Sequence, residues 1–183
     1  MTLPLFLEIE NIRVVHASWV TSDIDKLRKW TSGDLKLTEE LLQKSAQKSS
    51  EEFNTIENIL KGAELKLSEG QQFKDKDENS RDEIRVRWWE SAVDRTYKEM
   101  AFPKVPDDFV DKPIERDRAA NLPVYNDPAP VFFGHYWLDP IGEPRVQADN
   151  ICCLDYSVAK NGSLAAYCWK GEKSLKNDRI VRV

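Results

Sequence analysis

The chain contains little histidine and little cysteine, and neither type occurs in a pattern typical of a zinc or disulfide protein. There are two histidines and three cysteines, Cys152, Cys153 and Cys168, in 183 residues, and no Cys-x-x-Cys spacing occurs. Neighbouring cysteines in a strand point to opposite faces of the sheet, so Cys152 and Cys153 make poor disulfide partners. We therefore expect free, buried thiols in a reducing cytoplasm.

Long apolar runs and basic stripes are also missing. No run is long enough to span a bilayer, and the first residues lack the basic start of a signal peptide, since Glu8 interrupts their apolar stretch. Lysine and arginine form no stripe and the net charge is −5, which is not the pattern of a nucleic-acid-binding protein. We expect neither a membrane nor a nucleic-acid partner, although an acidic protein can handle phosphates where metal ions supply positive charge.

The hydrophobic content and length predict a folded chain with a substantial core. Hydrophobic residues make up 40% of the chain, which is enough for one domain over residues 1–183. The strand candidates are 12–15, 131–133, 150–154, 163–169 and 180–183, with a tight turn at Asn161-Gly162. Since these runs lie near both ends of the chain, we expect an α+β fold with a helical and irregular insert over 31–129.

Apolar spacing and capping residues predict three helices within the insert and just before it. Ser22 begins the first, which carries Ile24, Leu27 and Trp30 at three-residue spacing. Thr38 caps the second. Ser49 with Glu52 matches a capping box for the third, which stops near Gly62.

The rest of the insert is predicted to be largely non-helical. The polar segment 71–83 is best explained by a hairpin or long loop with Asp77-Glu78-Asn79 at its turn. The prolines of 101–130 exclude long helices and indicate an ordered surface excursion.

The two histidines, His16 and His135, each close a short apolar run that is typical of a strand. An imidazole at the end of a buried strand is held rigidly at the edge of a sheet, where metal and phosphate chemistry is often assembled. Gly134 would also let the backbone approach a ligand closely. The alternative is a pair of packed histidines bonded to backbone or water, and a hydrolytic metal centre needs carboxylates or amides as well.

Several segments, in order, resemble the calcineurin-like metallophosphoesterases. Residues 3–19, with LPLFLEI followed by IRVVHASW, are similar to the family's fourth metal-binding block, in which a strand ends in His-Gly or His-Ala. The run FFGHYW at 132–137 is similar to the fifth, Gly-His block. The tail 150–167 resembles the closing strands, where Leu-Asp precedes a Gly-x-Leu-x-Ala-x hairpin. The resemblance spans nearly the whole chain, including 84–89, and is greatest to the bacterial protein-phosphatase and dinucleoside-tetraphosphatase branch.

The family's first three blocks have no counterpart. Asp-x-His, Gly-Asp-x-x-Asp and Gly-Asn-His-Glu lie upstream of the fourth block in the family, whereas here fifteen residues precede His16. Gly33-Asp34 follows His16, so its order is wrong and it indicates a turn. The resemblance therefore implies the C-terminal part of a metallophosphoesterase, with part of its αββα sandwich. A late start codon, a split gene or a trimmed chain would each produce this.

In the family, two divalent ions (Mn, Fe or Zn) activate a hydroxide that attacks phosphorus. The resemblance implies that His16 and His135 ligate the second ion, and that the substrate is a phosphomonoester, a phosphoprotein or a dinucleoside polyphosphate. Two imidazoles alone hold a hard divalent ion weakly, since such ions prefer oxygen ligands. We therefore expect weak metal binding and little or no phosphatase activity from the isolated chain.

Five further residues are candidates for the site. Arg85 and Arg87, on one face of a strand, could grip a phosphate, or could pair with nearby acids. Tyr136 and Trp137 could stack on a nucleobase or aryl group, or pack in the core. Asp155 could orient a histidine ligand, or cap a turn.

Two functions are consistent with these residues. The first is the C-terminal part of a metal-dependent phosphoesterase. The second is a non-catalytic remnant that acts as an interaction or oligomerisation module. Both predict sheet edges and an apolar face left uncovered by the missing segments, and such surfaces favour a homo-oligomer.

Overall fold

The computed structural model describes residues 3–31, 33–75 and 78–183 and confirms the α+β class. The chain forms two compact units, the first made of Met1–Lys61 with Asn126–Val183 and the second of Gly62–Tyr125. The insert predicted over 31–129 is divided between these two units. The helical part of that insert belongs to the first unit, because its apolar side chains are buried there.

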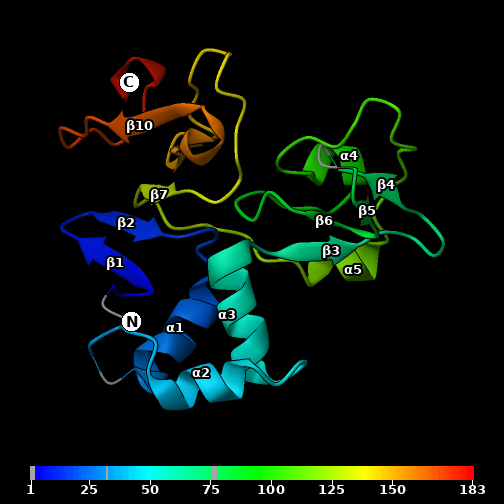
Figure 1. Ribbon diagram of the computed structural model, residues 1–183, viewed down its shortest axis with the longest axis horizontal. Helices are drawn as coiled ribbons and strands as arrows, with labels where there is room; N and C mark the ends of the chain where they lie inside the picture. Colours follow the sequence, from blue (N-terminus) through cyan, green and yellow to red (C-terminus); the bar gives the residue numbers. More distant parts are fainter. Residues whose placement is uncertain (1–2, 32, 76–77) are drawn as a thin grey trace. The chain divides into compact units, whose positions relative to one another are not determined.

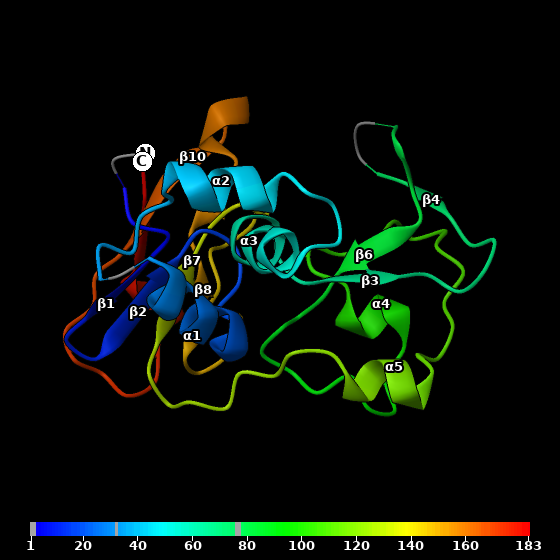
Figure 2. The ribbon, with the colours of Figure 1, turned by 90° about the horizontal axis from the view of Figure 1, so that it is seen from below.

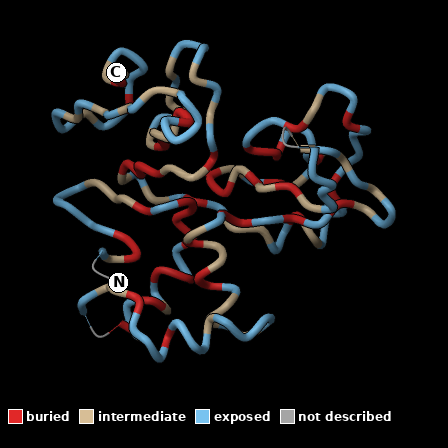
Figure 3. Tube along the Cα trace, viewed as in Figure 1, coloured by how far each residue is buried: buried red, intermediate tan, exposed pale blue. Residues whose placement is uncertain are grey.

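A four-stranded sheet forms the centre of the first unit (Figure 1). It consists of β1 (Phe6–Ile9), β2 (Ile12–Val15), β7 (Val131–Phe133) and β8 (Ile151–Cys153), in that order. β1 and β2 are antiparallel, whereas β2, β7 and β8 are parallel to one another. Every residue of β7 and β8 is buried, as expected for parallel strands covered on both faces (Figure 3).

Three helices cover one face of this sheet: α1 (Thr21–Trp30), α2 (Glu39–Ser45) and α3 (Glu51–Lys61) (Figures 1 and 2). The predicted cap of α2 is confirmed, since the Thr38 hydroxyl accepts the N–H of Leu41. The predicted cap of α3 is wrong by one residue. Ser50 accepts the N–H of Phe53, while Ser49 adopts a left-handed conformation with φ 68°. Because an N-cap has extended backbone, Ser49 is unsuited to the position.

A three-stranded sheet lies on the other side of the central sheet (Figure 1). It contains β9 (Asp155–Tyr156), β10 (Ser163–Tyr167) and β11 (Ile180–Arg182), with the short helices η1 (Val158–Lys160) and η2 (Asn177–Arg179) in its connections. All the predicted strands are present, some one or two residues shorter than expected. The two sheets enclose a core that includes Phe132, Cys152, Tyr156, Leu175 and Ile180.

The second unit is built on β3 (Glu64–Lys66), which pairs antiparallel with β6 (Glu83–Arg85). Between them, β4 (Phe73–Lys74) and β5 (Ser80–Arg81) form the predicted hairpin. Asp77 of the predicted turn lies outside the described residues. The helices α4 (Tyr97–Met100) and α5 (Arg116–Ala120) complete the unit.

The proline-dense stretch is not a surface excursion. Its one helix in this unit, α5, is short, in agreement with the prediction that prolines exclude long helices. However, Val105, Phe109 and Ile114 are buried. Fully buried Trp88 and Tyr97 belong to the same unit. Apolar side chains between the prolines therefore form part of a core, which the proline count could not indicate.

Candidate functional site

The two histidines meet at the carboxyl edge of the central sheet. β2 and β7 pair in parallel, with Arg13 level with Val131 and Val14 level with Phe132, and the two histidines follow the ends of these strands. The N–H of Gly134 donates to the carbonyl oxygen of His16 at 2.9 Å. The imidazole rings of His16 and His135 lie with their centroids 5.2 Å apart and their planes at 59°. The expectation that the two rings converge is confirmed.

The backbone around the histidines contains several left-handed residues. His135 has φ 74°, Trp137 has φ 52° and Ser157 has φ 61°. Non-glycine residues rarely adopt this region, and clusters of them are found where the surrounding structure holds a functional loop in place. His16 is exposed, whereas His135 is half-buried and the Nε2 atom of its ring is buried.

Asp155 holds the loop that follows His135. Its carboxylate accepts the N–H of Trp137 at 3.2 Å and the N–H of Ser157 at 3.0 Å. Its backbone oxygen accepts the N–H of Leu138. These bonds correspond to the turn-capping alternative, and a role in orienting a histidine ligand stays a prediction.

Tyr136 and Trp137 have different environments. Tyr136 is 2% exposed and packs edge-on against Phe133 with centroids 5.4 Å apart, so it belongs to the core below the histidines. Trp137 is 36% exposed, and the ammonium of Lys160 lies 4.3 Å from its ring centroid. This is a cation–π contact at the edge of the site. Sequence reasoning missed Lys160, because no local pattern relates η1 to the loop after β7.

Arg85 and Arg87 belong to the second unit. Each is half-buried between fully buried neighbours, which follows the predicted alternation, although β6 ends at Arg85. Arg85 lies 3.6 Å from the carboxylate of Glu64, and Arg87 lies 3.3 Å from that of Glu90. The alternative of pairing with acids is therefore present in both, and a phosphate contact remains a prediction.

The ring separation suits one shared cation. An imidazole nitrogen lies about 1.2 Å from the ring centre and binds such an ion at about 2.1 Å, so two rings on one ion have centroids roughly 4.7 to 5.4 Å apart at angles between 90° and tetrahedral. The observed 5.2 Å falls in this range. Among the residues the structure describes, no group of three or more His, Cys, Asp or Glu is placed to hold a metal ion. Two imidazoles would be only a partial ligand set for such an ion.

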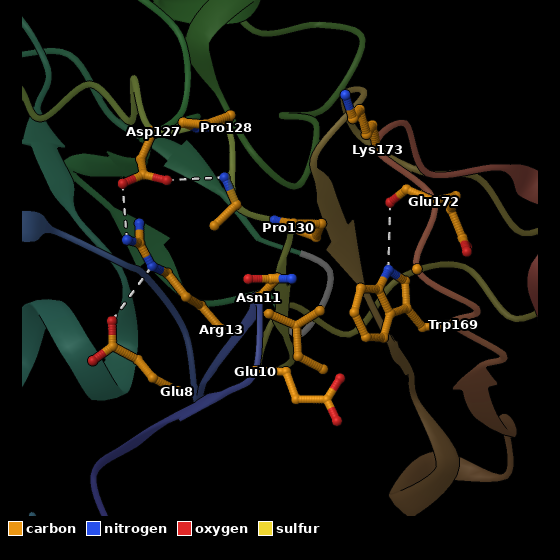
Figure 4. Close-up of a pocket in the computed structure, with 13 residues that line it drawn as sticks. Glu8, Glu10, Asn11, Arg13, Asp127, Pro128, Pro130, Trp169, Glu172 and Lys173 are labelled. Atoms are coloured by element: carbon orange, nitrogen blue, oxygen red, sulfur yellow. Dashed lines mark hydrogen bonds and ion pairs between the residues drawn. The ribbon is translucent and has the colours of Figure 1, made fainter.

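An ion-pair clamp holds the strands that carry the histidines (Figure 4). Arg13 of β2 contacts Glu8 of β1 at 3.6 Å and Asp127, just before β7, at 2.8 Å. Asp127 also accepts the N–H of Ala129, and this bond, together with Arg13, holds the pKa of Asp127 below its ordinary value. These residues line a cavity of about 650 Å³, whose opposite wall is Trp169.

Comparison of the chain with models of protein families, with curated proteins and with solved structures finds no match. Within the described residues, no helix has both the length and the apolar character needed to cross a membrane.

Proposed function

We propose that the chain is the C-terminal part of a metal-dependent phosphoesterase of the calcineurin-like type. The observation that carries the proposal is the convergence of His16 and His135 at the carboxyl ends of adjacent parallel strands. Ligands commonly bind outside the carboxyl ends of such strands. The order of layers in the first unit, helices followed by two sheets, is compatible with part of an αββα sandwich.

In this proposal, His16 and His135 hold one divalent ion (Mn, Fe or Zn) through neutral ring nitrogens, and the complete enzyme holds two. Bound divalent ions supply positive charge to a phosphate and act as a Lewis acid. Trp137 offers an exposed ring for an aryl or nucleobase group, and Lys160 places an ammonium beside it that attracts phosphate. The substrate is then a phosphorylated small molecule or phosphoprotein. Asp155 keeps the loop between these groups in place.

The described residues supply two of the ligands that such a centre needs, so we expect weak metal binding and little turnover from this chain alone. A cytoplasmic location is part of the proposal, since Cys152, Cys153 and Cys168 are all free thiols. Arg85 and Arg87 are retained as candidates for binding a phosphate group.

A metal titration followed by NMR tests the proposal. With two histidines in the chain, the two ring C–H signals are simple to assign by His16→Ala and His135→Ala. Substoichiometric Mn²⁺ should broaden both ring signals in parallel, and either substitution should reduce the effect on the remaining ring. Broadening that either substitution leaves unchanged, or none at millimolar Mn²⁺, would contradict a shared ion. Hydrolysis of p-nitrophenyl phosphate that persists in both variants would also overturn the assignment.

A second candidate function is an interaction or oligomerisation module, and the outer face of β10 and β11 favours it. Leu164, Val181 and Val183 are 58%, 49% and 90% exposed, and Leu164 pairs with Val183 across the two strands. Apolar side chains gathered on an open sheet face are typical of a contact surface. Sedimentation should then show a dimer or larger assembly that Leu164→Ser with Val181→Ser converts to monomer. A wild-type monomer at tens of micromolar would contradict it.

A further inference from the structure

The segment that follows His16 caps the end of α3. The last four carbonyl groups of a helix have no partner within it and need one from elsewhere. The N–H of Ala17 donates to the carbonyl of Ile59 at 2.9 Å, and the hydroxyl of Ser18 donates to the carbonyl of Asn58 at 2.5 Å. Ala17 and Ser18 are completely buried. The position of α3 therefore fixes the path of the backbone directly after His16.

A buried carboxylate on α1 in turn holds α3. Asp23 is 4% exposed, and its two oxygens accept bonds from the amide of Asn58 at 2.8 Å and the hydroxyl of Thr55 at 3.2 Å. The ammonium of Lys26 lies 3.2 Å away and balances the charge. A buried carboxylate is tolerated only with such partners, so the contact is specific in geometry.

These bonds form one continuous connection from Asp23 to the histidine pair. Asn58 binds Asp23 through its side chain and Ser18 through its carbonyl, and Ala17 joins Ser18 to His16. His16 is then bonded through its carbonyl oxygen to Gly134, next to His135. We propose that Asp23 is a positioning residue for His16, and that its carboxylate keeps the imidazole within reach of His135 by fixing the last turn of α3.

This inference rests on the proposed function for its purpose, but its geometry does not depend on a metal. A contact that only stabilises the fold would lower the unfolding temperature and leave the ring pair unchanged in the folded molecules. A positioning contact changes the ring pair while the protein remains folded. The two roles are therefore separated by measuring the rings themselves.

The experiment compares Asp23→Asn with Asp25→Asn in the full chain. Asp25 lies two residues away on α1, with its side chain 54% exposed and paired to Arg28 at the surface, so it is a matched control. In Asp23→Asn the new amide group replaces an acceptor with a donor facing Asn58 or Thr55. We expect the nuclear Overhauser effect between the His16 and His135 rings to fall at least about twofold in Asp23→Asn, and to stay unchanged in Asp25→Asn.

Mn²⁺ affinity, followed by ring broadening, should weaken about tenfold in Asp23→Asn, a loss typical of residues that orient metal ligands. If Mn²⁺ does not broaden the wild-type ring signals, the proposed function fails. The nuclear Overhauser effect between the rings still tests the role of Asp23 in that case. Wild-type ring signals in folded Asp23→Asn would overturn the inference. If Asp23→Asn does not fold, Ser18→Ala tests the inference in its place, because it removes only one hydroxyl and one bond of the connection. An unchanged nuclear Overhauser effect between the two rings in Ser18→Ala would overturn the inference.

Discussion

Gly134 and His16 face each other at the ends of β7 and β2, where the N–H of the glycine donates to the carbonyl of the histidine at 2.9 Å. This bond lies just beyond the ladder of β2 and β7, whose last pair is Val14 with Phe132. A shift of the pairing by one residue would turn alternate side chains to the other face. The closeness of the two imidazoles is therefore a property of strand register.

The Arg13 clamp gives a prediction about pH. Bonds from Ala129 and Arg13 lower the folded-state pKa of Asp127, so its carboxylate stabilises the fold above its unfolded pKa. That stability is lost as the pH falls through the folded pKa. Asp127→Asn should therefore reduce the free energy of unfolding at pH 7 by about 1 kcal/mol or less, because the side chain is 42% exposed and screened.

Urea denaturation at pH 7 and at pH 3 measures this effect. The difference between wild type and Asp127→Asn should be smaller at pH 3 than at pH 7. Asp108→Asn, at an exposed position of the second unit, is the control and should show no comparable difference. A gap that widens in acid would contradict the stabilising role of the carboxylate.

The cysteines should differ sharply in reactivity. Burial raises the pKa of Cys152 and of Cys153 to about 12, whereas Cys168 is exposed. Since the thiolate is the reactive form, a disulfide reagent at pH 8 should modify one thiol in the folded protein and three after denaturation. Cys168→Ser should abolish the reaction of the folded protein. Fast modification of two or more thiols without denaturant would show that β8 is open to solvent.

A pair of identical substitutions tests the packing of the helices. Leu27 of α1 is completely buried, whereas Leu42 of α2 is 54% exposed. Leu27→Ala should lower the free energy of unfolding by about 2 to 5 kcal/mol, because it removes buried methyl groups and leaves a cavity. Leu42→Ala should change it by about 0.5 kcal/mol or less. Denaturant unfolding at pH 7 measures both, and equal losses would mean that α1 is not packed as described.

Gly162 should tolerate no side chain. A Cβ at this position would lie 2.0 Å from the carbonyl oxygen of Tyr156 and 2.7 Å from the backbone of Ser157. Backbone atoms cannot give way as a flexible side chain can, so Gly162→Ala should disrupt the β9–β10 connection and lower the midpoint of thermal unfolding by several degrees. Gly142→Ala is the control, since nothing lies within 4 Å of its Cβ. Similar midpoints for the two variants would count against this connection.

Features that depend on neighbouring residues in the sequence were predicted well. Thr38 caps α2, Gly62 follows the end of α3, and the strands of the C-terminal segment fall where their apolar runs lie. Capping and strand formation depend on side chains within a few positions, so local patterns are informative. The cap of α3 was misplaced from Ser50 to Ser49, because two adjacent serines offer the same chemistry and backbone conformation decides between them.

Features that depend on distant contacts were predicted less well. The burial of Tyr136, the stacking of Lys160 on Trp137 and the bonds of Asp23 to α3 each join segments that no local pattern relates. The ion pair of Arg85 with Glu64 likewise joins two strands, whereas Arg87 pairs with nearby Glu90. The acid with which an arginine pairs depends on which carboxylates the fold places within reach of it.

By itself, the sequence determined that the chain forms an α+β protein with apolar strands at both ends and a histidine after each of two such strands. Hydrophobic periodicity and capping are enough for this, because each element forms from its own residues. The tertiary structure alone decided that β2 and β7 pair in parallel, with His16 bonded to Gly134 and the two imidazoles 5.2 Å apart. That register depends on burying both faces of the central sheet and on the Arg13 clamp, and both bring together parts of the chain that are far apart in sequence.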